Sequence, residues 1–331
     1  MRKILFYLLA LIIVCFSIPI LFTNRKSIQE VSSEINTNNQ IVENKYDYKD
    51  YQTIKLLHVA SNEIEEIDLD TYLYGVVSAE MPASFEKEAL KAQAVVARTY
   101  TIYKIQNDNK KHENADICDD SNCCQAWISK EDRFAKWEEA TCQANWDKIV
   151  EAVDSTQGKI ITYDGKPINA FFHSNSGGMT ETTVNVWGSG EYPYLQTVAT
   201  SGEENYTQYH SEVTLNKQTF IDKIKEQHND FEINFNEEDC IKILEYTEGN
   251  RVKKIKIGNL ELSGVEIRTI LGLKSANFKI SIENENVKIE VTGYGHGVGM
   301  SQTGADSMAK QGYNYEEIIK HFYSGVEIEN L

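Results

Sequence analysis

The sequence predicts an α+β protein, with an N-terminal transmembrane helix followed by one domain that mixes helices with antiparallel strands. Three observations predict this class. The chain opens with a long apolar run, its next part carries helical periodicity, and its second half carries short β-rich runs joined by turn signals. Because strands and helices do not alternate regularly, a segregated α+β arrangement is favoured over a parallel α/β sheet.

The apolar run covers residues 4–22. At about 1.5 Å per helical residue it approaches the thickness of a bilayer core, about 30 Å. A cleaved signal peptide is the alternative, but the run exceeds the usual apolar length of about 7 to 15 residues and no small-x-small pattern follows it. The pattern therefore predicts a single-pass protein of the cell membrane, with most of the chain on the outer, non-cytoplasmic side.

We expect three parts along the chain: a cytoplasmic tip and anchor at 1–23, a flexible stalk at 24–51, and a folded domain at 52–331 with a subdomain at about 208–290. The stalk is rich in Asn, Ser, Glu and Lys, a composition typical of flexible segments. With 33 basic and 50 acidic residues the net charge is −17. No basic block follows Lys26, which excludes nucleic acid as an expected partner.

Two helices open the folded domain and are expected to meet at a break. Asp70 can cap a helix over 72–77, and Pro82 disfavours the helical conformation just before it, so Glu80 is expected in the break. A second helix at about 84–106 carries a stripe of small residues that allows close packing.

An irregular polar loop at 107–130 and a helix at about 131–156 come next. Asp164 and Gly165 form a strong two-residue turn signal between β-rich runs at 159–163 and 166–173. The second run leads into a glycine-containing loop.

The region at 208–290 is interpreted as a helix, strand pairs, a short helix at 265–271 and a hairpin. A strand at 287–291 leads into a glycine-rich segment, and two helices close the chain. In the last of these, Asn314 and Glu317 have capping-box spacing.

Glu80 is the candidate catalytic acid. Its neighbours Val77 and Met81 are apolar, and a carboxyl group that loses solvation has its pKa raised, which suits a general acid. The alternative is that Glu80 merely caps the second helix.

Several blocks of the sequence resemble the stage II sporulation protein D family, in the order of that family. They are GVVSAEMP at 75–82, EALKAQAVVARTY at 88–100, FHSNSGG at 172–178, VWG at 186–188 and YGHGVGMSQ at 294–302.

The resemblance implies a lytic transglycosylase of peptidoglycan that acts in engulfment during sporulation. Such an enzyme cleaves between N-acetylmuramic acid and N-acetylglucosamine without water and leaves 1,6-anhydro ends. Glu80 would be its acid, in a catalytic domain at 52–331. A two-carboxylate glycoside hydrolase is the alternative enzyme, for which Asp306 could supply the second carboxylate.

The same blocks, together with YPYL at 192–195, which also matches a block of the family, suggest substrate-binding residues. They are Lys91, Arg98, His173, Ser176, Tyr194, His296 and Gln302. Lys91 and Arg98 lie seven residues apart on one helical face, where they could bind sugar substituents or simply form a solvated face. The histidines follow strands and could face a cleft or be structural; Tyr194 could stack on a sugar or belong to the core.

His112, Cys118, Cys123 and Cys124 are candidate metal ligands within one loop. The loop resembles an element that holds zinc in some members of the family, and thiolates with imidazole suit a structural Zn²⁺ site. Because adjacent cysteines need a kinked backbone to share a metal, Cys123 is the weakest candidate. A disulfide is the alternative in an exported protein.

The implied partners are glycan strands stripped of stem peptides, an amidase that strips them, and a multi-spanning membrane protein of the engulfment machinery. A non-catalytic, zinc-stapled wall-binding module is the remaining alternative, and it would not need Glu80. No His-Glu-x-x-His motif occurs, which argues against a zinc protease.

Overall fold

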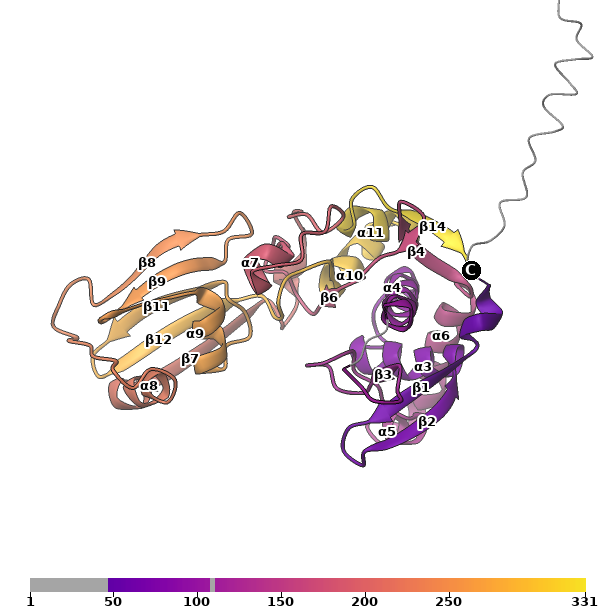
Figure 1. The fold of residues 1–331 in the computed structure, drawn as a ribbon, viewed down its shortest axis with the longest axis horizontal. Helices are drawn as coiled ribbons and strands as arrows, with labels where there is room; N and C mark the ends of the chain where they lie inside the picture. Colours follow the sequence, from indigo (N-terminus) through magenta and orange to yellow (C-terminus); the bar gives the residue numbers. More distant parts are fainter. Residues whose placement is uncertain (1–46, 108–110) are drawn as a thin grey trace, which may run out of the picture. The chain divides into compact units, whose positions relative to one another are not determined.

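The computed structural model describes residues 47–107 and 111–331, and within them the fold is α+β (Figure 1). The described strands form small sheets of two or three strands each. The larger hydrophobic core is therefore built mainly around helices. The α+β part of the predicted fold class is confirmed.

The described chain begins with a small sheet followed by helices. Strand β1 (Thr53–His58) pairs antiparallel with β2 (Glu63–Asp68) and parallel with β3 (Ile117–Cys118). The other elements of this part are η1 (Tyr48–Tyr51), α3 (Leu69–Glu80), α4 (Lys87–Gln106), α5 (Lys130–Phe134) and α6 (Glu139–Asp154).

Helix α4 is the centre of this core. The side chains of Ala89, Ala92, Ala94 and Ala97 are fully buried, so small residues cover much of its surface. Neighbouring helices can approach closely against such a surface. Helices α3, α6, α10 and α11 all contact α4.

The C-terminal segment returns to this helical core. Strand β13 (Met300–Ser301) pairs parallel with β6 (Phe172–His173), and β14 (Glu327–Asn330) pairs antiparallel with β4 (Lys159–Tyr163). The remaining elements of this part are β5 (Lys166–Pro167), α7 (Thr183–Trp187), η2 (Glu203–Asn205), α10 (Gln302–Lys310) and α11 (Tyr315–Phe322). As a result, the start of α10 lies near the end of α3.

A second hydrophobic core involves the segment between β7 and β12. It contains two sheets, with strand orders β10-β9-β8 and β11-β12-β7, and two helices. On β12, Val287, Ile289 and Val291 are fully buried, the period-two pattern of a strand with one buried face. The elements are β7 (His210–Asn216), α8 (Lys217–Lys225), β8 (Ile241–Tyr246), β9 (Val252–Ile257), β10 (Leu260–Leu262), α9 (Gly264–Leu271), β11 (Phe278–Glu283) and β12 (Asn286–Thr292).

Several predicted boundaries differ from the structure. The second helix begins at Lys87 instead of residue 84, and the helix expected first in the region at 208–290 follows strand β7. Helix α3 is capped by Asp68, not Asp70, and ends at Glu80 instead of Val77, so Glu80 is the last helical residue and the break begins at Met81. The helix expected at 131–156 is divided into α5 and α6 by a turn, which lets Trp137 pack against the core. The run at 166–173 is not one strand, because its last two residues pair with β13 instead of β4.

The structure corrects the predicted membrane placement. In the described part of the chain no helix is long and apolar enough to cross a bilayer. Helix α4 has 20 residues but includes charged side chains such as Lys91 and Lys104. The apolar run at 4–22 lies outside the described residues. The transmembrane part of the predicted fold class and the single-pass localisation are therefore not retained.

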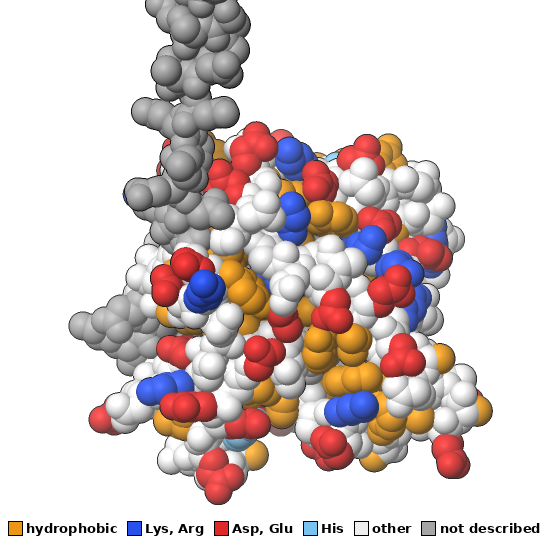
Figure 2. All heavy atoms as spheres, turned by 90° about the vertical axis from the view of Figure 1, so that its right-hand side faces the viewer, with side chains coloured by type: hydrophobic (Ala, Val, Ile, Leu, Met, Phe, Trp, Pro, Cys, Tyr) orange, Lys and Arg blue, Asp and Glu red, His pale blue; other side chains and the backbone are white. Residues whose placement is uncertain are grey.

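Figure 2 shows the charge distribution on one face of the molecule. Acidic side chains are spread over this face, with Lys and Arg side chains interspersed among them.

Candidate functional site

Glu80 is the last residue of α3, and both of its carboxylate oxygens accept hydrogen bonds. Oε1 accepts from the backbone N–H of Ala126 at 2.8 Å, and Oε2 accepts from Nε2 of Gln302 at 3.0 Å. The chain leaves the helix at Met81, which is extended as expected for a residue before proline. Three separate segments thus fix the position of the carboxyl group.

Burial raises the pKa of Glu80 above its ordinary value, because a low-dielectric surrounding disfavours the charged form. The hydrogen bonds from Ala126 and Gln302 act in the opposite direction, since both stabilise the carboxylate. The balance favours an acid that can hold its proton and then accept the negative charge.

Glu80 opens into a pocket of about 430 Å³. Its wall consists of Ala79, Glu80, Met81, Pro82, Ala83, Ser84, Arg133, Trp137, Asn145 and Gln208. Among these described lining residues, Glu80 is the sole acid and Arg133 the sole base. The pocket therefore offers one carboxyl group, one cation, an aromatic ring and two amides.

Asp306, the other candidate carboxylate, is bonded to groups of the protein away from the Glu80 pocket wall. Its side chain is fully buried, Oδ1 accepts from the N–H of Glu86 at 2.6 Å, and Oδ2 accepts from the Tyr206 hydroxyl at 2.7 Å. Lys310 pairs with it at 2.8 Å. Asp306 is absent from the Glu80 pocket wall, and its bonds hold the start of α4 instead.

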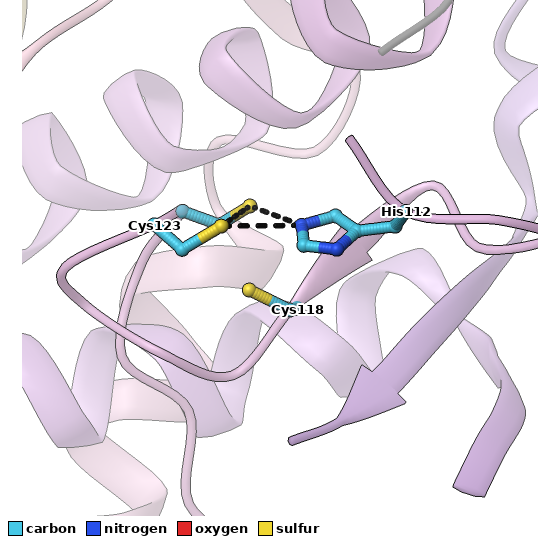
Figure 3. Close-up of side chains that lie close together, drawn as sticks. His112, Cys118 and Cys123 are labelled. Atoms are coloured by element: carbon cyan, nitrogen blue, oxygen red, sulfur yellow. Dashed lines mark hydrogen bonds between the residues drawn. The ribbon is translucent and has the colours of Figure 1, made fainter. Parts of the chain in front are cut away.

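The four candidate metal ligands converge at one point. Their ligand atoms all lie within 4.8 Å of one another. Nε2 of His112 lies 3.3 Å from Sγ of Cys123 and 3.4 Å from Sγ of Cys124, and the two sulfurs are 3.8 Å apart. Figure 3 shows His112, Cys118 and Cys123 directed toward the same point.

The separations among His112, Cys123 and Cys124 are close to those around a tetrahedral metal ion, and the full set with Cys118 spans at most 4.8 Å. Zinc with bonds of about 2.3 Å to sulfur and about 2.0 Å to nitrogen has ligand-to-ligand edges of roughly 3.5 to 3.8 Å. The sulfur separation of 3.8 Å also exceeds a disulfide bond of about 2.05 Å. The described cysteines, Cys118, Cys123 and Cys124 among them, are free thiols.

The metal-ligand loop leads directly to Glu80. Cys124 is followed by Gln125, whose buried amide donates to the Tyr72 hydroxyl at 2.7 Å and to Oγ1 of Thr101 at 3.0 Å. The next residue, Ala126, supplies the N–H bonded to Glu80. The conformation of the loop that carries the candidate metal ligands therefore fixes the position of the N–H group that donates to Glu80.

The predicted substrate-binding residues on α4 lie outside the pocket wall. Arg98 is fully buried and donates to the carbonyl of Thr156 at 2.9 Å, and it pairs with Asp70 at 3.4 Å. Lys91 pairs with Glu88 at 2.7 Å, beside the ring of Tyr315. Both cations have partners within the protein.

The two histidines lie next to each other, with ring centroids 5.6 Å apart. Burial lowers the pKa of His173 to about 3 and that of His296 well below its ordinary value, so both rings are neutral at neutral pH. Nδ1 of each ring bonds the backbone of Val298. Neither imidazole lines the Glu80 pocket.

Ser176 and Tyr194 are also buried. The Ser176 hydroxyl donates to Glu203 at 2.5 Å, within a buried network that further includes Ser301. The Tyr194 hydroxyl accepts from the N–H of Asn169 at 3.0 Å. Of the predicted substrate-binding residues, Gln302 is the one that the structure brings to Glu80.

Sequence reasoning missed four pocket residues, which are Arg133, Trp137, Asn145 and Gln208. The spacing of Arg133 and Trp137 suggests one helical face, but no turn signal marks the end of α5 between them. Gln208 comes from a segment that carries no recognisable motif. Their convergence is a property of the tertiary structure.

Comparisons with known proteins identify relatives over most of the chain. A family model described as "Stage II sporulation protein" matches residues 58–163, which include Glu80, the metal-ligand loop and Arg133. The chain is 36% identical to stage II sporulation protein D of Bacillus amyloliquefaciens over 278 residues, covering 83% of this chain and 78% of the relative. The corresponding protein of Bacillus subtilis (strain 168) is 35% identical, with the same coverage. An "Amidase enhancer" of Bacillus subtilis (strain 168) is 29% identical over 77% of this chain and 40% of that protein.

Proposed function

Because the chain belongs to the stage II sporulation protein D family, and so has a sporulation role related to the cell wall, we propose that it is a lytic transglycosylase of peptidoglycan. It would cleave the bond between N-acetylmuramic acid and N-acetylglucosamine and leave 1,6-anhydro ends. The single carboxyl group in the wall of the Glu80 pocket carries this proposal.

The proposed reaction needs one residue that gives and then takes a proton. Protonated Glu80 donates its proton to the glycosidic oxygen as the bond to C1 of the muramic acid breaks. The resulting carboxylate accepts the proton of the C6 hydroxyl on the same sugar, whose oxygen bonds to C1. Atoms balance without water, and Glu80 ends as it began.

The surroundings of Glu80 suit both halves of this cycle. Burial favours the neutral acid before cleavage. The donors from Ala126 and Gln302 stabilise the carboxylate while it exists. A hydrolase with two carboxylates would require a second acid on the opposite side of the sugar, and the described pocket wall supplies none.

We further propose that His112, Cys118, Cys123 and Cys124 hold one Zn²⁺ ion. Bound there, zinc would supply a crosslink between the thiolates and the imidazole. The four residues hold the loop that presents the Ala126 N–H to Glu80, so their role is structural.

The proposed substrate is glycan strands stripped of stem peptides, and the proposed partners are a stem-peptide amidase and a multi-spanning membrane protein of engulfment. The proposal of an amidase partner is supported by the name of one relative, which is called an amidase enhancer.

The proposal is tested by incubating peptide-free glycan strands with the full chain and with its Glu80→Gln variant. Chromatography of strand lengths should show shortening by the wild type only. Equal shortening by a folded Glu80→Gln protein would overturn the assignment of the acid. Binding without shortening by both proteins would favour the wall-binding module.

A further inference from the structure

Arg133 is a cation in the wall of the Glu80 pocket and has no ion-pair partner within the described part of the chain. It lies in α5, and its Nε is buried without a hydrogen-bond partner. Burial lowers the pKa of its guanidinium, and no acidic group of the described chain opposes that effect. A cation that has lost solvation without gaining a counter-charge is in an unfavourable position unless a ligand supplies one.

Arg133 is half-buried, and two more deeply buried arginines show the contrast. Arg98 pairs with Asp70. Arg251 donates to the carbonyls of Met179 and Ser176, both at 3.0 Å. Nε lacks a partner in all three arginines. Arg98 and Arg251 are nevertheless bonded to the protein through their other guanidinium nitrogens, whereas Arg133 lines an open pocket and has no side-chain hydrogen bond or ion pair to another described residue.

Trp137 holds Arg133 in place. The guanidinium carbon lies 4.8 Å from the centroid of the indole ring, which also lines the pocket. Stacking on an aromatic ring orients a guanidinium plane and leaves its edge free for an anion. The short turn after α5 places Trp137 against Arg133.

The nearby lysines have other contacts. Lys148 donates to the carbonyl of Ala83 at 2.9 Å, and Lys130 lies 5.3 Å from the ring centroid of Phe134. Neither lysine lines the pocket, so Arg133 is the positive group available beside Glu80 in the described pocket wall.

We infer that Arg133 binds the lactyl carboxylate of the N-acetylmuramic acid whose C1 carries the bond to be cleaved. This inference rests on the proposed function. The lactyl ether is attached to C3 of that ring, so its carboxylate must lie close to the acid that protonates the bond at C1. A planar guanidinium matches a carboxylate with two parallel hydrogen bonds.

Arg133 then determines which strands are cleaved. Removal of the stem peptide leaves the lactyl group as a free carboxylate, whereas an attached peptide converts it to a neutral amide. The amide can neither accept the paired hydrogen bonds of a carboxylate nor neutralise Arg133. The preference for stripped strands is thus assigned to one side chain.

The test uses three short glycan oligomers that differ only at the lactyl group: the free carboxylate, its methylamide, and the intact stem peptide. In the oligomer with the intact stem peptide, the carboxylates lie on the peptide and not on the lactyl group. This oligomer therefore distinguishes binding of the lactyl carboxylate from binding of a peptide carboxylate. Calorimetric binding is measured to the full chain with Glu80→Gln, which prevents cleavage, and with Arg133→Gln or Arg133→Lys added. Lys136→Gln, an exposed charge on the adjacent turn, is the matched control.

With Arg133 present, the free carboxylate should bind about 10- to 100-fold more tightly than the methylamide, the range for a hydrogen bond to a charged group. Arg133→Gln should bring the ratio close to one, Arg133→Lys should leave part of it, and Lys136→Gln should not change it. A ratio that survives Arg133→Gln, a ratio near one with Arg133 present, or tightest binding of the peptide form would overturn the inference. The proposed function fails by a separate result, the absence of anhydro ends after digestion by the wild type.

Discussion

Gln302 donates a hydrogen bond from Nε2 to Oε2 of Glu80 at 3.0 Å, joining residues 222 positions apart. The bond forms because α10 packs on α4, whose start follows the end of α3. The C-terminal part of the chain therefore completes the surroundings of an acid located near the start of the described domain.

Replacing Gln302 should change the pH dependence of the reaction. Its bond stabilises the charged carboxylate and lowers the pKa of Glu80, so Gln302→Ala should raise that pKa further. The acid then stays protonated to higher pH, and the alkaline limb of kcat/KM should move upward while the maximum falls about tenfold through lost positioning. A pH–rate profile checks this; an alkaline limb that moves downward would contradict it.

Glu80→Gln should make stability less sensitive to pH. Because the folded-state pKa of Glu80 is raised, the native protein binds the proton more tightly than the unfolded chain. Ionisation therefore costs stability as the pH rises from the unfolded pKa, about 4.3, through the folded value. Thermal unfolding should show a gain in Tm for the variant at neutral pH that disappears near pH 4. A gain in Tm of the variant that occurs only at acidic pH would contradict this prediction.

Loss of one proposed zinc ligand should disorder the loop before Ala126. Cys118→Ser should lose zinc and most activity with little change in far-UV circular dichroism, since the helices of the core also pack directly on one another. Cys142→Ser, a free thiol outside the cluster, is the control and should retain both. Elemental analysis and thiol counting decide; no metal in the wild type, with two thiols masked until reductant is added, would show a disulfide.

Arg98 should matter for stability. Arg98→Met leaves Asp70 without its buried cation, and breaking a buried pair costs about 3 to 5 kcal/mol. Lys87 lies on the same helix as Arg98 and forms a surface pair with Glu151 of α6, so Lys87→Met should cost less than about 1 kcal/mol. Urea unfolding measures both. A folded Arg98→Met protein with unchanged stability and a raised KM would instead support the substrate-binding role predicted from the sequence.

One turn and one helix cap could be predicted from the sequence, because each depends on residues only a few positions apart. Asp164 and Gly165 both have positive φ, as the two-residue turn requires, and the Asn314–Glu317 capping box is present. The approach of Gln302 to Glu80 could not be predicted, because no short-range rule links such distant residues; the resemblance names Gln302 only as a substrate-binding residue. The pairing of Arg98 could not be predicted for the same reason, because its carboxylate partner Asp70 lies on another helix.

The product ends test the central claim most directly. Peptide-free glycan strands are digested with the full chain in water enriched in heavy oxygen, and the new ends are identified by mass. We expect muramic acid ends that are one water lighter than a reducing sugar and that contain no heavy oxygen, because the C6 hydroxyl of the sugar replaces water. Reducing ends that carry heavy oxygen would identify a hydrolase and contradict the account.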